Sequence, residues 1–326
     1  MKTLLMLMLC HFSVSNALEQ ACHSVIMVRP ASFGFNADTA SNNPYQHGDL
    51  PLTEEEVNAQ ASAEFDAFVD KLRAEGVRVH VLQDTLAPHT PDSIFPNNWI
   101  SLHHDGTVIT YPMFGENRRR ERELPVFDLL NERYKVCHHV DLETFEQEER
   151  YLEGTGSIVF DHINRVAYAC SSEWTDKGLF NDVCDLLEYR GMLFDAADQN
   201  GNAIYHTNIM LFIGTDVAVV CSDAISDDEQ RTAVLQALAK EGREVIEITQ
   251  DQLDSFCGNL LEVQSQEGNR IIAMSERAFS SFTEAQWHTF AKHAIVVVAP
   301  IDLIEVVGGG SARCMLLGNH LPIQVE

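Results

Sequence analysis

The sequence predicts an α/β fold that is built as a closed ring of about five repeated units. The main evidence is a series of hairpins that begin at Asn98, Ser157, Asn208 and Asn259, with the next equivalent position at Cys314. These positions are 59, 51, 51 and 55 residues apart. A period of roughly 50–60 residues indicates an array of supersecondary units, none of which can bury its apolar face alone.

A doubly wound parallel sheet is the alternative, because its strands and helices alternate in a similar way. Parallel neighbours in such a sheet are joined by a crossover, whereas here a hairpin precedes each helix. The hairpins therefore favour the ring. In a ring the equivalent strand starts converge on the axis, so functional residues are expected at equivalent places in several units.

Each predicted hairpin has two apolar strands around a turn signal, such as Asp105-Gly106 in the first. A more divergent unit begins earlier, near residues 25–29. The four clear hairpins span residues 98–111, 157–169, 208–220 and 259–273.

Amphipathic helices are expected where apolar residues recur at intervals of three and four, because this spacing places them on one helical face. The first helix is expected to begin at Thr53, where Glu56 completes a capping box, and to end at Gly76. The helical stretches include residues 57–72, 179–187 and 234–238. Further strands complete the units at residues 77–82, 244–248 and 294–299.

We treat residues 1–20 as an N-terminal extension and residues 21–326 as one domain. Lys2 precedes a mostly apolar run that resembles a short secretory signal, although His11 within the run argues against it. The run is too short for a membrane span, and no later segment has about 18 uninterrupted apolar residues. We expect a cytoplasmic protein, or a secreted or organellar one if residues 1–17 are a cleaved signal.

The charge of the chain argues against two classes of partner. There are 22 Lys and Arg residues against 49 Asp and Glu residues, which gives a formal net charge of −27. Nucleic-acid binding needs cationic side chains to neutralise phosphates, and anionic membranes attract basic segments. We therefore expect no nucleic-acid partner and no membrane partner, and we interpret the surplus charge as a solvated surface.

The eight cysteines are scattered, with no CxxC pair and no Cys/His group at zinc spacing. Several lie in apolar runs, such as Cys221, and are predicted to be buried. Cys314 differs because it follows the run Gly308-Gly-Gly-Ser-Ala-Arg313. Glycines let the backbone approach a ligand closely, and a neighbouring cation favours the thiolate. Cys314 is therefore the candidate nucleophile.

Other polar residues occur where the hairpins begin. His206 is a natural acid–base partner for a nucleophilic thiol. Glu153 precedes a Gly-Thr-Gly turn that leaves room for a substrate, although the same residues also suit an ordinary turn. Asn97 and Asn98 either provide amide groups for a ligand or serve as turn residues.

Taken in order, these motifs resemble those of the guanidino-group-modifying (pentein) superfamily over roughly residues 24–322. The resemblance is closest to the arginine-deiminase-related branch, which includes citrulline-utilisation hydrolases. It implies a five-bladed α/β propeller of ββαβ units with pseudo-fivefold symmetry. The motifs are Ile26-Met-Val-Arg-Pro30, Phe33-Gly-Phe-Asn36, Phe95-Pro-Asn-Asn-Trp99, Gly106-Thr-Val, Tyr111-Pro-Met, Asn117-Arg-Arg-Arg120, Glu153-Gly-Thr-Gly, His206-Thr-Asn and Gly308-Gly-Gly-Ser-Ala-Arg-Cys314.

The resemblance implies that Cys314 is the nucleophile, His206 the acid–base group and Glu153 a carboxylate that orients the substrate. Arginine deiminases have aspartates at the positions of Asn98 and Asn208, where they bind a cationic guanidinium group. Two amides in their place suit a neutral ureido group, which both donates and accepts hydrogen bonds.

We therefore expect a cysteine hydrolase that converts L-citrulline to ornithine, ammonia and carbon dioxide without a metal or an organic cofactor. Asn97 is a further candidate for substrate binding, and Arg118, Arg119 and Arg313 are candidates for binding the amino-acid carboxylate. A homo-oligomer is compatible with the sequence. The alternatives are a deiminase, dihydrolase or amidinotransferase that acts on a guanidino substrate, and a pentein without activity that serves as a binding scaffold.

Overall fold

A recurring set of three strands organises the chain in the computed structural model, which describes residues 18–40 and 43–324. In each set the first strand pairs antiparallel with the second, and the second pairs parallel with the third after a helical crossover. The predicted mixed α/β class is confirmed. The predicted signal segment at residues 1–17 lies outside the described residues.

The described strands form five such sets, and each set follows the same order of pairing. They are β15 (Leu317–Asn319), β1 (Ser24–Arg29) and β2 (Val79–Gln83); β3 (Ile100–Leu102), β4 (Thr107–Thr110) and β5 (His138–Asp141); β6 (Val159–Asp161), β7 (Val166–Cys170) and β8 (Arg190–Phe194); β9 (Leu211–Ile213), β10 (Val217–Val220) and β11 (Glu244–Glu247); and β12 (Leu261–Gln264), β13 (Arg270–Ser275) and β14 (Ile295–Ala299).

One set combines strands from the two ends of the described chain. β15 pairs antiparallel with β1, with Asn319 opposite Ser24, and the Asn319 amide donates to Ser24 Oγ at 3.1 Å. A single bridge from Asn319 to Leu102 joins this set to β3 and makes a six-stranded sheet. The sequence placed a unit near residues 25–29 but did not predict its C-terminal partner strand.

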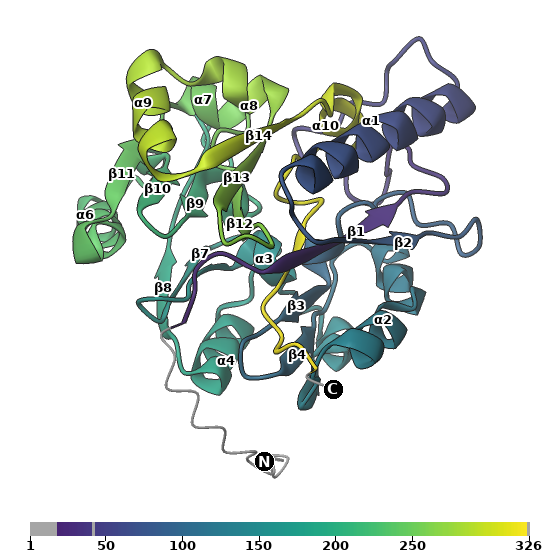
Figure 1. The fold of residues 1–326 in the computed structure, drawn as a ribbon, viewed down its shortest axis with the longest axis horizontal. Coiled ribbons are helices and arrows are strands. Elements are labelled where there is room, and N and C mark those ends of the chain that lie inside the picture. Colours follow the sequence, from purple (N-terminus) through teal and green to yellow (C-terminus); the bar gives the residue numbers. More distant parts are fainter. Residues whose placement is uncertain (1–17, 41–42, 325–326) are drawn as a thin grey trace.

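The crossover helices lie toward the periphery of the molecule, while the strands lie inside (Figure 1). In the first of these helices, Thr53 and Glu56 form the predicted capping box, and Gly76 adopts a positive φ just beyond the last turn. The crossover helices are α1 (Glu54–Ala74), α2 (Val126–Arg133), α4 (Lys177–Leu187), α6 (Asp228–Leu238), α8 (Glu276–Ser281) and α9 (Glu284–His293).

Short helical turns precede the first strand of each set, and α3 lies near the middle of the view in Figure 1. These turns are η1 (Pro96–Asn98), α3 (Gly154–Ser157), α5 (Thr207–Met210), α7 (Gln250–Asp254) and α10 (Asp302–Gly308). The remaining short 3₁₀ segments are η2 (Asn117–Glu123), η3 (Glu143–Glu148), η4 (Ser222–Ala224) and η5 (Lys240–Gly242).

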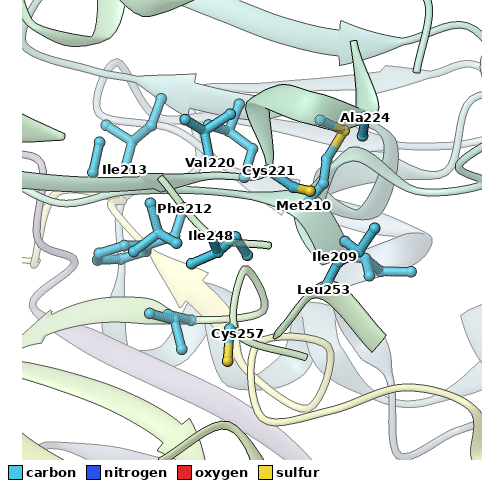
Figure 2. Close-up of a cluster of buried hydrophobic side chains, with 14 of the residues drawn as sticks. Ile209, Met210, Phe212, Ile213, Val220, Cys221, Ala224, Ile248, Leu253 and Cys257 are labelled. Carbon is cyan, nitrogen blue, oxygen red and sulfur yellow. The ribbon is translucent and has the colours of Figure 1, made fainter. Parts of the chain in front are cut away.

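A buried apolar cluster fixes the turn α5 against its sheet and its neighbours (Figure 2). Ile209 and Met210, at the end of α5, pack in the same cluster as Val220, Ile248 and Leu253. Burying a side chain of this size stabilises the fold by about 1.5–3 kcal/mol. The core therefore holds the polar residues at the start of α5 in one position.

Gln20 is buried, although the sequence predicted that it belongs to the N-terminal extension. Its side-chain amide donates to the carbonyls of Phe160 and Ile213 and accepts from the backbone of His162. The cysteines of the described chain, Cys221 among them, are free thiols. No described helix is long and apolar enough to cross a membrane.

Candidate active site

One pocket lies where the helical turns before the inner strands meet. Four of the predicted residues, Cys314, His206, Asn98 and Arg118, line it together. They come from three strand sets: Asn98 and Arg118 belong to the set of β3, His206 precedes the set of β9, and Cys314 precedes β15. The other lining residues are Thr39, Asn43, Asp92, Phe95, Trp174, Tyr205 and Gly308, Gly309 and Gly310.

Cys314 follows α10 and is only 4% exposed. Two side-chain amides point at its sulfur: Asn259 Nδ2 at 3.3 Å and Asn208 Nδ2 at 3.6 Å. Hydrogen bonds of this kind strengthen when the acceptor carries negative charge. The sulfur is therefore placed beside two donors that suit an anionic nucleophile.

His206 and Glu153 form a buried pair next to the pocket. His206 Nε2 lies 3.0 Å from Glu153 Oε2, and the backbone N–H of Phe114 donates to Glu153 Oε1 at 3.0 Å. Burial lowers the pKa of His206, and the hydrogen bond and charge of Glu153 oppose this effect. Glu153 thus contacts the imidazole of His206 directly and orients that ring. The carboxylate of Glu153 lies behind His206 and is not part of the pocket lining.

Gly156 allows α3 to pack closely against both Asn98 and His206. A Cβ atom at this position would overlap with Asn98 Nδ2 and would lie 2.9 Å from His206 Nδ1. Only glycine fits here without displacing a pocket residue. The Gly-Thr-Gly segment therefore serves close packing of the site as well as turn formation.

Arg118 is a buried cation that holds Asn98 in one orientation. Its Nη1 donates to Asn98 Oδ1 at 2.9 Å, and its Nε donates to Glu121 at 2.8 Å. Asp92 and Glu153 each lie 3.9 Å away. Burial disfavours the charged guanidinium, but the carboxylates of Glu121, Asp92 and Glu153 outweigh it and raise the pKa of Arg118.

Two buried polar atoms of the pocket lining, Asp92 Oδ1 and Asn98 Nδ2, have no hydrogen-bond partner in the described part of the chain. The same holds for Oδ1 of Asn208, which is not in the lining but lies beside Cys314. The other oxygen of Asp92 accepts from Asn36 Nδ2 at 2.6 Å. A buried polar atom without a partner is costly, so a bound polar group that satisfies these atoms gains free energy. The pocket thus offers one donor and two acceptors to a ligand.

The glycine run before Cys314 is covered by an N-terminal loop. Gln46 Nε2 donates to the carbonyl of Gly308, and Tyr205 Oη donates to that of Gly309. Gly309 has a φ of 63°, and a Cβ atom there would lie 2.7 Å from Asn43 Nδ2. The run therefore needs glycine both for its backbone conformation and for the fit of this loop.

Three predicted substrate-binding residues do not reach this pocket. Asn97 is buried beneath α3, where its carbonyl accepts from Thr155 Oγ1, and its side-chain amide has no partner among the described residues. Arg313 donates to the carbonyl of Leu316 and lines a second pocket. Arg119 donates to the carbonyl of Met113 and pairs with Glu146. Arg118 reaches the pocket, but its donors mostly bind protein groups.

Two residues of the site, Asn259 and Asp92, were not predicted from the sequence. Asn259 starts the fourth hairpin, as Asn208 starts the third, so its equivalent position was a signal that could have been used. Asp92 lies in an irregular segment before Phe95, and no local pattern marks it.

The sequence matches the family model for eukaryotic N,N-dimethylarginine dimethylhydrolases over residues 29–321. Among curated proteins no sequence matches the chain.

Solved structures with a similar fold include ArgZ, an arginine dihydrolase from the ornithine–ammonia cycle in cyanobacteria, with 16% identity and a TM-score of 0.71. That match covers 92% of this chain but only 41% of ArgZ, so the chain spans about two-fifths of that protein. The separate N-terminal domain of ArgZ, bound to substrate, matches with a TM-score of 0.70 and 15% identity, over 92% of this chain and 99% of the domain.

DDAH from Pseudomonas aeruginosa, solved as a mutant complexed with citrulline, matches with a TM-score of 0.62 and 14% identity, over 91% of this chain and 99% of that one. At such identities the likeness concerns the fold.

Proposed function

Because the chain belongs to the family of eukaryotic N,N-dimethylarginine dimethylhydrolases, within the pentein guanidino-modifying superfamily, we propose that it hydrolyses a carbon–nitrogen bond of a ureido or guanidino amino acid. L-citrulline is the leading substrate. Its conversion consumes one water and yields ornithine, ammonia and carbon dioxide.

Cys314 acts as the nucleophile in this proposal, and His206 acts as the acid–base group. The thiolate attacks the ureido carbon, and the negative charge passes to the ureido oxygen. His206 then gives a proton to the nitrogen that leaves, so that a thiocarbamate remains on sulfur. A water molecule, deprotonated by His206, releases the thiolate, and the carbamic acid product decays to carbon dioxide and an amine or ammonia.

The orientation of Asn98 is the single observation that carries the choice of a ureido group. Arg118 donates to Asn98 Oδ1, which leaves Nδ2 as the group that Asn98 can offer to a ligand. A ureido oxygen accepts a hydrogen bond from such a donor, whereas a guanidinium group has donors only. The ureido N–H groups would bind Asn208 Oδ1 and Asp92 Oδ1.

A guanidino substrate is the second candidate, and Asp92 favours it. Three carboxylates, Asp92, Glu121 and Glu153, surround the one guanidinium of Arg118 within 4 Å. This excess of acidic groups suits a second cation in the pocket, and Asp92 Oδ1 is without a partner among the described residues.

A substrate comparison tests the proposal. The purified protein is incubated with citrulline, arginine and dimethylarginine, and ornithine, citrulline and ammonia are measured. We expect ornithine from citrulline, its loss in Cys314→Ala, and nearly unchanged turnover in Cys137→Ala, a free cysteine outside the pocket. Faster turnover of a guanidino compound would select the second candidate. Inactivity toward all compounds would leave a binding scaffold, and normal turnover by Cys314→Ala would contradict the mechanism.

We further interpret the five strand sets as five blades of one propeller-like domain over residues 21–326, with the proposed site on its axis. The equal pairing order in every set supports this reading, as does the joining of the chain ends in β1 and β15. We propose a cytoplasmic protein whose reaction at Cys314 needs no metal or organic cofactor.

A further inference from the structure

Three histidines that are far apart in the sequence meet at the other ends of the strands that begin at the proposed active site. His104 follows β3, His162 follows β6 and His320 follows β15. Each of these strands is three residues long, which separates the two ends by about 10 Å. Each ring offers one nitrogen to the cluster, and these three nitrogens all lie within 4.8 Å of one another.

We propose that His104, His162 and His320 bind a zinc ion that connects three of the strand sets. Three histidine nitrogens around a small volume are a known ligand set for Zn²⁺, with a fourth position for water or another ligand. This site lies outside the mechanism proposed for Cys314 and does not depend on it.

The hydrogen bonding of the three rings supports the proposal. In the described part of the chain, His104 Nε2 and His320 Nδ1 are buried without any partner. Unsatisfied buried nitrogens are rare in folded proteins and point to a bound ion or water. His104 also interacts with the backbone of Glu19, so its other nitrogen is already used.

His162 has the arrangement typical of a metal ligand. Its Nδ1 lies 2.8 Å from Tyr189 Oη, which fixes the ring and leaves Nε2 for the ion. Burial lowers the pKa of His104 to about 4, and it also lowers the pKa of His162 and that of His320 well below the usual value. All three rings are then neutral at physiological pH, and neutral imidazole is the form that binds metal.

A second pocket adjoins two of the three rings. His162 and His320 line it together with Gln20, Glu262 and Arg313. Arg313 adds a cation that disfavours the ion, but Glu262 offers a carboxylate whose Oε1 is without a partner among the described residues. Glu262 therefore brings a carboxylate oxygen to the pocket that adjoins His162 and His320.

Zinc titration of the chelator-treated full chain tests the proposal, with bound metal measured by elemental analysis. We expect one Zn²⁺ per chain. We also expect affinity to fall more than ~10-fold in His104→Gln and in His320→Gln, because even an outer partner of a metal ligand has an effect of that size. His288→Gln is the matched control, since His288 is an exposed histidine of α9.

Two further measurements separate this site from zinc bound at Cys314 and from misfolding. Cys314→Ser should keep its zinc, and Co²⁺ in place of zinc should give a spectrum without a thiolate charge-transfer band. Near-ultraviolet circular dichroism should show that the histidine variants are folded. Zinc that is lost in Cys314→Ser but kept in folded His104→Gln and His320→Gln would overturn the proposal, as would failure of the wild type to bind zinc.

Discussion

At the residue scale, two opposing effects set the proton affinity of His206. Burial lowers its pKa, while the hydrogen bond and charge of Glu153 raise it. In the proposed mechanism the protonated imidazole delivers a proton to the leaving nitrogen. The protonated fraction falls as pH rises through the pKa of His206, so activity should be lost on the alkaline side.

Replacing Glu153 should shift the pH at which activity is lost on the alkaline side. In Glu153→Gln the favourable charge is gone, so the pKa of His206 falls further and activity declines at a lower pH than in the wild type. We expect kcat to drop ~100-fold, a typical contribution of acid–base catalysis. The pH profile of kcat/KM measures both effects.

Glu121→Gln is the matched control, because Glu121 pairs with Arg118 but does not contact His206. The alkaline limb of its kcat/KM profile should stay close to that of the wild type. An unchanged limb in Glu153→Gln would show that this carboxylate does not tune the imidazole.

At the element scale, the short turns before the inner strands position the chemistry. The hairpins and the ends of α1 were predictable because local periodicity and capping residues mark them. The turns α3 and α5 have four residues each, too few for a helical period, so only their polar residues were recognisable. Their geometry depends on packing from other sets, such as the approach of Gly156 to Asn98.

Adding a single methyl group should disrupt this approach. In Gly156→Ala the new Cβ would overlap with Asn98 Nδ2 and crowd His206. Overpacking of this kind costs about 1–3 kcal/mol, and here the displaced side chains belong to the proposed site. We expect kcat/KM to fall at least ~10-fold, with a smaller loss of stability in urea.

Gly34→Ala serves as the comparison, because a Cβ there has no heavy atom within 4 Å in the described structure. It should keep its activity and stability. Equal activity in the two variants would show that α3 is not tightly fitted to the pocket.

At the scale of the whole molecule, the features that could not be predicted from the sequence are those that depend on contacts between distant residues. The period predicted repeated units, but not the joining of β1 with β15 across the length of the chain. The same applies to Asp92, which lies in an irregular segment, and to the meeting of the three histidines, which come from separate strand sets. The side chain of Arg313 also depends on long-range packing: its neighbour Cys314 lines the first pocket, whereas Arg313 lines the second one.

The joining of the chain ends should matter for stability. Asn319 is fully buried, donates to Ser24 Oγ and accepts from the backbone N–H of Leu321. Asn319→Ala leaves both groups without this partner, so we expect a loss of about 2 kcal/mol. Urea unfolding measures it.

Asn131→Ala, at an exposed position of α2, should change the unfolding free energy little. If Asn319→Ala were equally mild, the hydrogen bonds between the chain ends would not stabilise the fold.

The most direct test of the central claim follows the ureido carbon itself. Citrulline labelled with ¹³C at this carbon is mixed with the protein, the reaction is quenched with acid, and the Cys314 peptide is analysed by mass spectrometry. We predict a labelled thiocarbamate on Cys314 during turnover, and labelled carbon dioxide and unlabelled ornithine as products. Ornithine formation without label on Cys314, or undiminished turnover in Cys314→Ala, would contradict the account.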